Sequence, residues 1–343
     1  MFAKALCMKR NWSHSNLPDS VLVETQARLH LGFLDMSGAL GRRFGSLGLS
    51  IQGFRTRLRA SHAASTHASG PSAPRAQRYA QQMLQDLGIE SGVHISLEES
   101  IPDHLGLGSG TQMALAVGRA IATLYGQEID TRYVAARLQR GARSGIGIGA
   151  FDEGGFLLDS GVGDEGSVPP VTARLLYPEH WRVLLVMDSR GQGLHGKQEV
   201  EAFKQLPPFP REQAAHLCHL TVMQILPGLR EHNLQAVGDG IAELQRLVGD
   251  HFAPAQGGRF TSPAVADALA WAAAEGFSGV GQSSWGPTGF VLMPGQESAE
   301  QLVAAANTRF GELSPLRFLI TAPCNTGSLI RPESTVEAVK EIR

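Results

Sequence analysis

The stretch Ile101–Thr111 reads IPDHLGLGSGT, and a run rich in small residues, QMALAVGRAIATLYG, follows it directly. Glycines let the backbone approach a ligand closely, and the first amides of a helix lack partners and carry partial positive charge. A glycine loop that opens a helix is therefore suited to bind a phosphate or a pyrophosphate. A turn that only caps the helix is the simpler alternative. We expect the phosphate-binding residues to be Gly106, Leu107, Gly108, Ser109, Gly110 and Thr111.

This loop matches neither of the two common phosphate-binding motifs. A Walker loop has a lysine after its second glycine, and none follows here. A dinucleotide fingerprint begins directly after a strand, whereas Pro102 separates the glycines from the nearest strand candidate, Val93–Glu98. The loop instead resembles the P-x-x-x-G-L-G-S-[GS] signature of the GHMP superfamily, which is named for galactokinase, homoserine kinase, mevalonate kinase and phosphomevalonate kinase. In those kinases the loop wraps the phosphates of ATP. The matching residues are Pro102, Gly106, Leu107, Gly108 and Ser109.

Composition limits the class of protein. The 343 residues suffice for two domains with real cores, and 43% are hydrophobic while 18% are charged. A net charge of −2 gives no electrostatic reason to expect a nucleic-acid or membrane partner, and no apolar run approaches the ~20 residues of a membrane span. The three cysteines are far apart, which argues against a disulfide framework or a zinc site. The N-terminus lacks the apolar stretch of a secretory signal, so we expect a cytoplasmic protein.

The order of strand-like and helix-like segments predicts an α+β fold. Residues 1–20 are interpreted as a loose leader, 21–170 as an N-terminal domain with the phosphate loop, and 171–343 as a C-terminal domain. Ser61–Ala76 is small, polar and contains proline, so we expect a mobile surface loop there. The expected strands are Val21–Gln26, Phe156–Asp159, Thr172–Tyr177, Arg182–Asp188, Thr288–Met293 and Leu316–Thr321. The expected helices are Gln77–Leu87, Thr111–Tyr125, Thr131–Arg140, Glu199–Gln205, Arg211–Leu226, Leu234–Val248, Ala264–Glu275 and Ala299–Phe310.

Two segments carry basic residues that can bind anions. Arg28 and His30 alternate with leucines, so they share one face of a strand, and an arginine there can fork onto a phosphate or carboxylate. Arg190, His195 and Lys197 follow a strand end, where the two cations can hold a phosphate and the histidine can shuttle a proton. Solvated basic surfaces are the alternative for both segments.

The segment Arg143–Gly155, RSGIGIGAFDEGG, resembles the S-G-x-D loop of the same kinases. Ser144 keeps the kinase frame, but Gly147 stands where many of those kinases have the aspartate that accepts a proton from the substrate hydroxyl. Homoserine kinase also lacks that aspartate, so a kinase stays possible. Asp152 and Glu153 are our candidates for catalytic carboxylates and for Mg²⁺ ligands.

A third segment, Gly281–Leu292, reads GQSSWGPTGFVL and resembles the S-G-S-G-P-T turn of homoserine kinase. In that turn we select Ser284 as a substrate-binding residue. Trp285 interrupts the pattern and can stack on an aromatic ring or a sugar. A purely structural tryptophan in the core is the alternative.

Together these segments resemble the β-ribofuranosylaminobenzene 5′-phosphate synthase family of the GHMP superfamily, over most of residues 21–330. The resemblance implies an S5-like N-terminal lobe and a ferredoxin-like C-terminal lobe, with the active site between them. It implies that phosphoribosyl pyrophosphate and 4-aminobenzoate condense, with loss of carbon dioxide and pyrophosphate, in tetrahydromethanopterin biosynthesis. This chemistry needs no organic cofactor, and we expect Mg²⁺ with the pyrophosphate. We also expect a homodimer, although the sequence does not fix the oligomeric state. The candidates to hold the sugar phosphate and the benzoate carboxylate are Arg28, Arg143 and Arg190.

Two alternatives remain open on the sequence alone. An ATP-dependent small-molecule kinase on the same fold is the first, and Gly147 counts against it. A ligand sensor without catalysis is the second, and tight binding of phosphoribosyl pyrophosphate without turnover would identify it.

Overall fold

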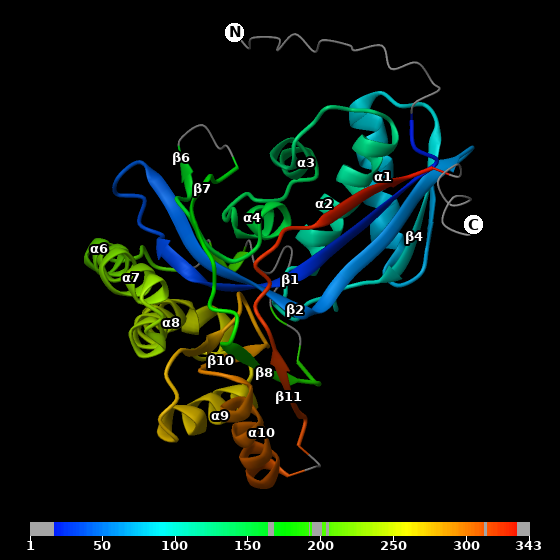
Figure 1. Cartoon of the computed structure of the whole chain (residues 1–343). Coiled ribbons are helices and arrows are strands. Elements are labelled where there is room, and N and C mark those ends of the chain that lie inside the picture. Colours follow the sequence, from blue (N-terminus) through cyan, green and yellow to red (C-terminus); the bar gives the residue numbers. More distant parts are fainter. Residues whose placement is uncertain are drawn as a thin grey trace.

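Two long antiparallel strands, β1 (Ser20–Asp35) and β2 (Arg42–Ala63), organise the N-terminal half of this computed structural model (Figure 1). The structure describes residues 17–163, 168–191, 193, 201–203, 206–311 and 314–334. Leu29–Leu34 is buried at every position, unlike a strand with one face in water. The reason is that β1 contacts helices α2 and α4 as well as helices α6 and α8 of the other lobe. Residues of β1 can therefore reach a site between the lobes.

The larger sheet has the order β12-β1-β2-β4-β3, and three further strands extend from the first part of β2. Its strands also include β3 (His67–Ser69), β4 (Gly92–Glu99), β5 (Phe156–Asp159), β6 (Val162–Gly163), β7 (Val171–Leu175) and β12 (Leu329–Glu333). Helices α1–α4 lie beside this sheet in the upper part of Figure 1. Their bounds are α1 (Ala73–Leu87), α2 (Ser109–Leu124), α3 (Thr131–Arg137) and α4 (Ile146–Asp152).

The smaller sheet has the order β11-β8-β10-β9 and lies in the lower part of Figure 1. Alternation along β8 (Arg182–Asp188) puts its residues into two cores. Leu184 and Val186 pack in one core with α9 and α10, whereas Val183 and Leu185 pack in the core shared with the N-terminal lobe. The remaining elements are α6 (Arg211–Leu220), the π-helix η2 (Thr221–Ile225), α7 (Leu226–Arg230), α8 (Leu234–Gln256), α9 (Pro263–Ala274), β9 (Val280–Gln282), β10 (Gly289–Met293), α10 (Gln296–Phe310) and β11 (Leu316–Thr321).

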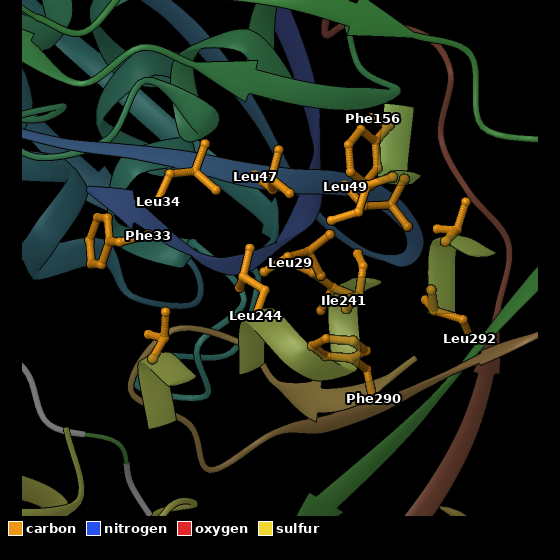
Figure 2. Packing of buried hydrophobic residues seen from close by; sticks show 14 of the residues in the cluster. Leu29, Phe33, Leu34, Leu47, Leu49, Phe156, Ile241, Leu244, Phe290 and Leu292 are labelled. Carbon is orange, nitrogen blue, oxygen red and sulfur yellow. The ribbon is translucent and has the colours of Figure 1, made fainter. Parts of the chain in front are cut away.

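One hydrophobic cluster joins the two lobes. Leu29 and Leu49 from the larger sheet lie beside Ile241 and Leu244 of α8 and Phe290 of β10 (Figure 2). All five are fully buried, and burial stabilises by roughly 25 cal/mol per Å² of apolar surface. The shared core holds the lobes together, so the cavity between them has walls from both.

The predicted α+β fold of two lobes is confirmed, while several local predictions need correction. Ser61–Ala76 is not a loop, because β2 runs to Ala63, β3 follows and α1 begins at Ala73. The glycine-rich Arg143–Gly155 contains the unexpected helix α4. Strands β7 and β12 both pair within the larger sheet, so that sheet draws on both sides of the division expected at residue 170. Most of the predicted leader, residues 1–16, lies outside the described residues.

Within the ranges that the structure covers, no helix combines the length and the hydrophobicity that a bilayer crossing needs.

Candidate active site

A cavity of about 850 Å³ lies between the lobes. Its walls come from β1, the start of α2, the segment 139–147, α8 and the turn 282–285. That volume suits a small-molecule ligand. The structure brings together seven of the residues predicted from the sequence, namely Arg28, His30, Thr111, Arg143, Ser144, Ser284 and Trp285.

The glycine loop ends at the start of α2, beside this cavity. Gly108 is the N-cap and adopts φ 86°, a left-handed conformation that favours glycine. The amides of Thr111 and Gln112 donate to the Gly108 carbonyl. Within the described chain, the amides of Ser109 and Gly110 have no such partner. They are the donors that the first turn of α2 leaves for an anion.

Contacts from β1 and from the second lobe fix the loop. Arg28 Nη1 donates to the Gly106 carbonyl at 2.7 Å, and Ser283 Oγ donates to the same oxygen at 2.8 Å. A Cβ on Gly106 would lie 2.3 Å from the Ser283 carbonyl oxygen, so only glycine fits there. The His30 amide in turn donates to Ser283 Oγ at 3.0 Å. Ser283, which we did not predict, therefore joins both lobes at the phosphate loop.

Arg140 is a further cation at this end of the cavity, and the sequence motifs did not identify it. A Cβ on Gly110 would lie 3.8 Å from Arg140 Nη1, so the guanidinium is adjacent to the free amides of α2. Arg140 Nη2 donates to the Tyr79 hydroxyl, and its Cζ lies 5.4 Å from the centre of the Tyr79 ring. Tyr79 thus holds Arg140 against the helix start.

The cavity is positively charged. The charged residues that line it in the described chain are Arg28, Arg140, Arg143, Arg259 and Glu201. Arg143 lies over the Phe203 ring at 4.3 Å from its centre. Arg259, also not predicted, pairs with Asp250 at 2.8 Å. A cavity with this excess of arginine is complementary to an anionic ligand.

Aromatic side chains form another part of the wall. Phe33, Phe252 and Trp285 all line the cavity. The Phe252 and Trp285 rings are 4.6 Å apart between centres, with a T-shaped arrangement. Trp285 is 7% exposed, so it is both a core residue and a cavity wall. This surface can accept a planar ring.

His30 is a neutral residue in this site. It is 6% exposed, and its Nε2 has no hydrogen-bond partner among the described residues. Burial, followed by the nearby Arg28 charge, lowers the pKa of His30 from 6.5 to about 3. The imidazole therefore adds no positive charge near neutral pH.

Ser144 at the cavity wall is tied to a buried carboxylate, Asp159. Ser144 Oγ and the Gly145 amide donate to Asp159 Oδ2 at 3.1 and 3.0 Å, and the Ser46 hydroxyl donates to the same oxygen. Asp159 is fully buried, and this burial raises its pKa against the opposing effect of those hydrogen bonds. Sequence reasoning missed Asp159, because it lies in an ordinary strand, β5.

Some predicted residues with described positions do not line the cavity, namely Asp152, Glu153, Arg190 and the loop residues 106–110, of which the last group directly precedes Thr111 at the wall. Asp152 and Glu153 lie at the far end of α4 from Gly147, which does line it, and Asp152 borders a separate depression with Arg119. The structure thus places both carboxylates away from this cavity, and their catalytic and Mg²⁺ roles stay predictions. Arg190 is exposed and pairs with Asp188 at 3.1 Å. His195 and Lys197 lie outside the described residues.

Comparisons with known proteins agree with this architecture. Residues 75–155 match the family GHMP kinases N terminal domain, and residues 225–312 match GHMP kinases C terminal. Homoserine kinase from Cytophaga hutchinsonii has a similar structure, with a TM-score of 0.62 and 18% identity over 94% of this chain and 100% of that one. Mevalonate diphosphate decarboxylase from Staphylococcus aureus gives 0.65 and 14% over 91% and 98%. The fold and the loop thus define a GHMP-type protein.

Curated relatives define the family within this class. The β-ribofuranosylphenol 5′-phosphate synthase of Archaeoglobus fulgidus is 32% identical over 240 residues, which are 66% of this chain and 75% of that protein. The synthase of the same name from Methanothermobacter thermautotrophicus is 27% identical over 332 residues, or 90% and 98% of the two chains. The chain belongs to the β-ribofuranosylphenol 5′-phosphate synthase family. The resemblance seen in the motifs is therefore confirmed.

Proposed function

We propose that this enzyme is a decarboxylating phosphoribosyltransferase, which condenses phosphoribosyl pyrophosphate with 4-aminobenzoate. The observation that carries the proposal is the joint position of three features on one cavity. These are the start of α2, where Thr111 lines the cavity directly after the free amides of Ser109 and Gly110, the guanidinium of Arg140 beside Gly110, and the aromatic wall at Phe252 and Trp285. A polyanionic sugar donor and an aromatic acceptor would need this combination.

The chemistry follows from where charge develops. The bond between the anomeric carbon and pyrophosphate breaks, and both its electrons leave with the pyrophosphate. Amides and guanidinium groups aimed at this leaving group stabilise it, and one such donor is worth roughly 3 kcal/mol in comparable sites. The para amino group pushes electrons to the ring carbon that bears the carboxylate, and this carbon bonds to the sugar. Loss of carbon dioxide then returns its bonding electrons to the ring and restores aromaticity.

The para substituent decides the product. The relatives are named for a ribofuranosylphenol, and the same chemistry gives a phenol from 4-hydroxybenzoate. We retain 4-aminobenzoate as the acceptor and 4-hydroxybenzoate as its competitor. Either product would be an intermediate in tetrahydromethanopterin biosynthesis and would form in the cytoplasm.

Mg²⁺ would enter with the pyrophosphate. Among the residues with described positions, no three His, Cys, Asp or Glu side chains form a group that could hold a metal. Mg²⁺ commonly binds substrate phosphates and water with few protein ligands. An ion held mainly by the pyrophosphate itself is therefore compatible with this cavity. Homodimer formation stays a prediction.

Gly147 argues against a kinase activity on this scaffold. A Cβ on Gly147 would lie 2.8 Å from Thr111 Cγ2, so an aspartate there would collide with the start of α2. Gly147 itself supplies no carboxylate to accept a proton from a hydroxyl substrate.

The direct test uses purified protein, Mg²⁺, phosphoribosyl pyrophosphate and carboxyl-labelled 4-aminobenzoate. Labelled carbon dioxide should appear in proportion to released pyrophosphate. Parallel reactions with carboxyl-labelled 4-hydroxybenzoate show which of the two acceptors the enzyme prefers. Release of ADP from ATP with polyols or mevalonate-like acceptors would support the kinase instead. Tight donor binding with neither product would support a sensor.

A further inference from the structure

Asp159 and Ser144 form a pair that the proposed reaction has not yet used. Ser144 lines the cavity, whereas Asp159 lies behind it with no exposed surface. Burial of a carboxylate is costly unless its oxygens accept hydrogen bonds. Here Oδ2 accepts from Ser144, Ser46 and the Gly145 amide, and Oδ1 accepts from the Gly161 amide at 2.8 Å. A buried carboxylate thus occupies a position that an apolar residue could fill without the cost of desolvating a charge.

This arrangement orients the Ser144 hydroxyl. A serine has one hydrogen to donate and two lone pairs that accept. Ser144 and Ser46 are 2.7 Å apart between their oxygens, and both contact the same carboxylate oxygen. Both hydroxyls donate to that carboxylate oxygen, so the Ser144 hydrogen points into the protein. The Ile146 amide donates to Ser144 Oγ at 3.2 Å, so one lone pair remains for the cavity.

A lone pair on the wall selects a hydrogen-bond donor. It repels a phosphate oxygen, which is itself an acceptor, and it attracts a hydroxyl or an amino group. Ser144 directly precedes Gly145, the N-cap of α4, and Gly147 of that helix packs on Thr111 at the start of α2. Ser144 therefore lies close to the proposed pyrophosphate socket. The part of the donor next to its pyrophosphate is the ribose ring.

We infer that Ser144 accepts a hydrogen bond from the ribose 2-hydroxyl of the sugar donor, and that Asp159 is the positioning residue that keeps Ser144 an acceptor. This inference rests on the proposed function, because it takes a phosphoribosyl donor as the ligand. Ser144 and Asp159 would then make the enzyme prefer ribosyl donors over 2-deoxyribosyl donors. A hydrogen bond at this hydroxyl also strengthens as positive charge develops on the sugar ring, as in glycoside cleavage.

The test compares binding of phosphoribosyl pyrophosphate and its 2-deoxy analogue by titration calorimetry, without any aryl acceptor. We expect the wild type to prefer the ribosyl donor by about two- to tenfold, the usual range for one neutral hydrogen bond. Ser144→Ala should bring the ratio close to one, and Asp159→Asn should reduce it because the amide can turn its N–H toward Ser144. Inorganic pyrophosphate should bind Ser144→Ala as it binds the wild type.

A matched control separates positioning from folding. Asp188 is also buried, and it accepts a hydrogen bond from Ser262 at 2.7 Å, but it does not line the cavity. Asp188→Asn should leave the donor ratio at the wild-type value even where it lowers stability. Ser46→Ala is the second variant if Asp159→Asn fails to fold, and it should lower the ratio in the same direction.

An unchanged ratio in Ser144→Ala would overturn the inference. The proposed function fails separately, through absence of carbon dioxide release while donor binding persists.

Discussion

Replacing Arg140 by methionine tests the anion socket most sharply. Methionine keeps the length and much of the packing of the arginine stem but removes the guanidinium. Arg140 Nη1 lies beside Gly110 at the start of α2, and Arg140 also contacts Tyr79 through a hydrogen bond to its hydroxyl and through its ring. The substitution should therefore weaken anion binding at this helix start.

The magnitude follows from the kind of interaction lost. A hydrogen bond to a charged group contributes roughly 1.5–3 kcal/mol, and each 1.4 kcal/mol is a factor of ten in affinity. The dissociation constant for pyrophosphate should rise by about 10- to 100-fold. The effect should shrink in high salt, because screening weakens the wild-type interaction.

Titration calorimetry with inorganic pyrophosphate and Mg²⁺ measures this constant. The control is Arg78→Met in α1, where the side chain is exposed, contacts the Pro74 carbonyl and does not line the cavity. Arg78→Met should bind pyrophosphate as the wild type does. A folded Arg140→Met protein that binds within twofold of the wild type would refute the role of Arg140.

Three further predictions concern buried residues. The pKa of the His30 imidazole is 6.5 in the unfolded chain and about 3 in the folded protein. Between these two pH values unfolding therefore takes up a proton, so the free energy of unfolding should fall by up to about 1.4 kcal/mol for each pH unit that the pH is lowered. Denaturant unfolding should show this slope diminished in His30→Phe, and equal slopes would contradict the burial argument. Gly147→Asp should lose about 1–3 kcal/mol of stability through its clash with Thr111 and gain no ATP-dependent activity, which thermal unfolding and ADP release would check. Asp159→Asn should lower the free energy of unfolding by about 1–3 kcal/mol, and a value within 0.5 kcal/mol of wild type, about the size of a neutral surface change, would show that the buried carboxylate contributes little.

Short-range patterns predicted much of the fold. Strand Arg182–Asp188 and helix α2 follow from apolar runs and a glycine-rich start. Helix α4 could not be predicted, since its glycines have low helix propensity. It forms because Gly147 and Gly149 allow close approach to Thr111 and Val171, which are tertiary contacts.

The candidate site was predictable where one motif contains its residues. Ser109 and Ser144 belong to such motifs, whereas Arg140 and Asp159 reach the site through helix packing and strand pairing. The predicted carboxylate Asp152 has a suitable residue type but lies at the wrong end of its helix. One-dimensional spacing does not say which end of a short helix faces a cavity.

The structure of the complex with phosphoribosyl pyrophosphate tests the central claim most directly. The account predicts that the diphosphate accepts hydrogen bonds from the Ser109 and Gly110 amides and from Arg140, with the ribose toward Ser144. A diphosphate bound elsewhere in the cavity, with these amides left to solvent, would contradict it.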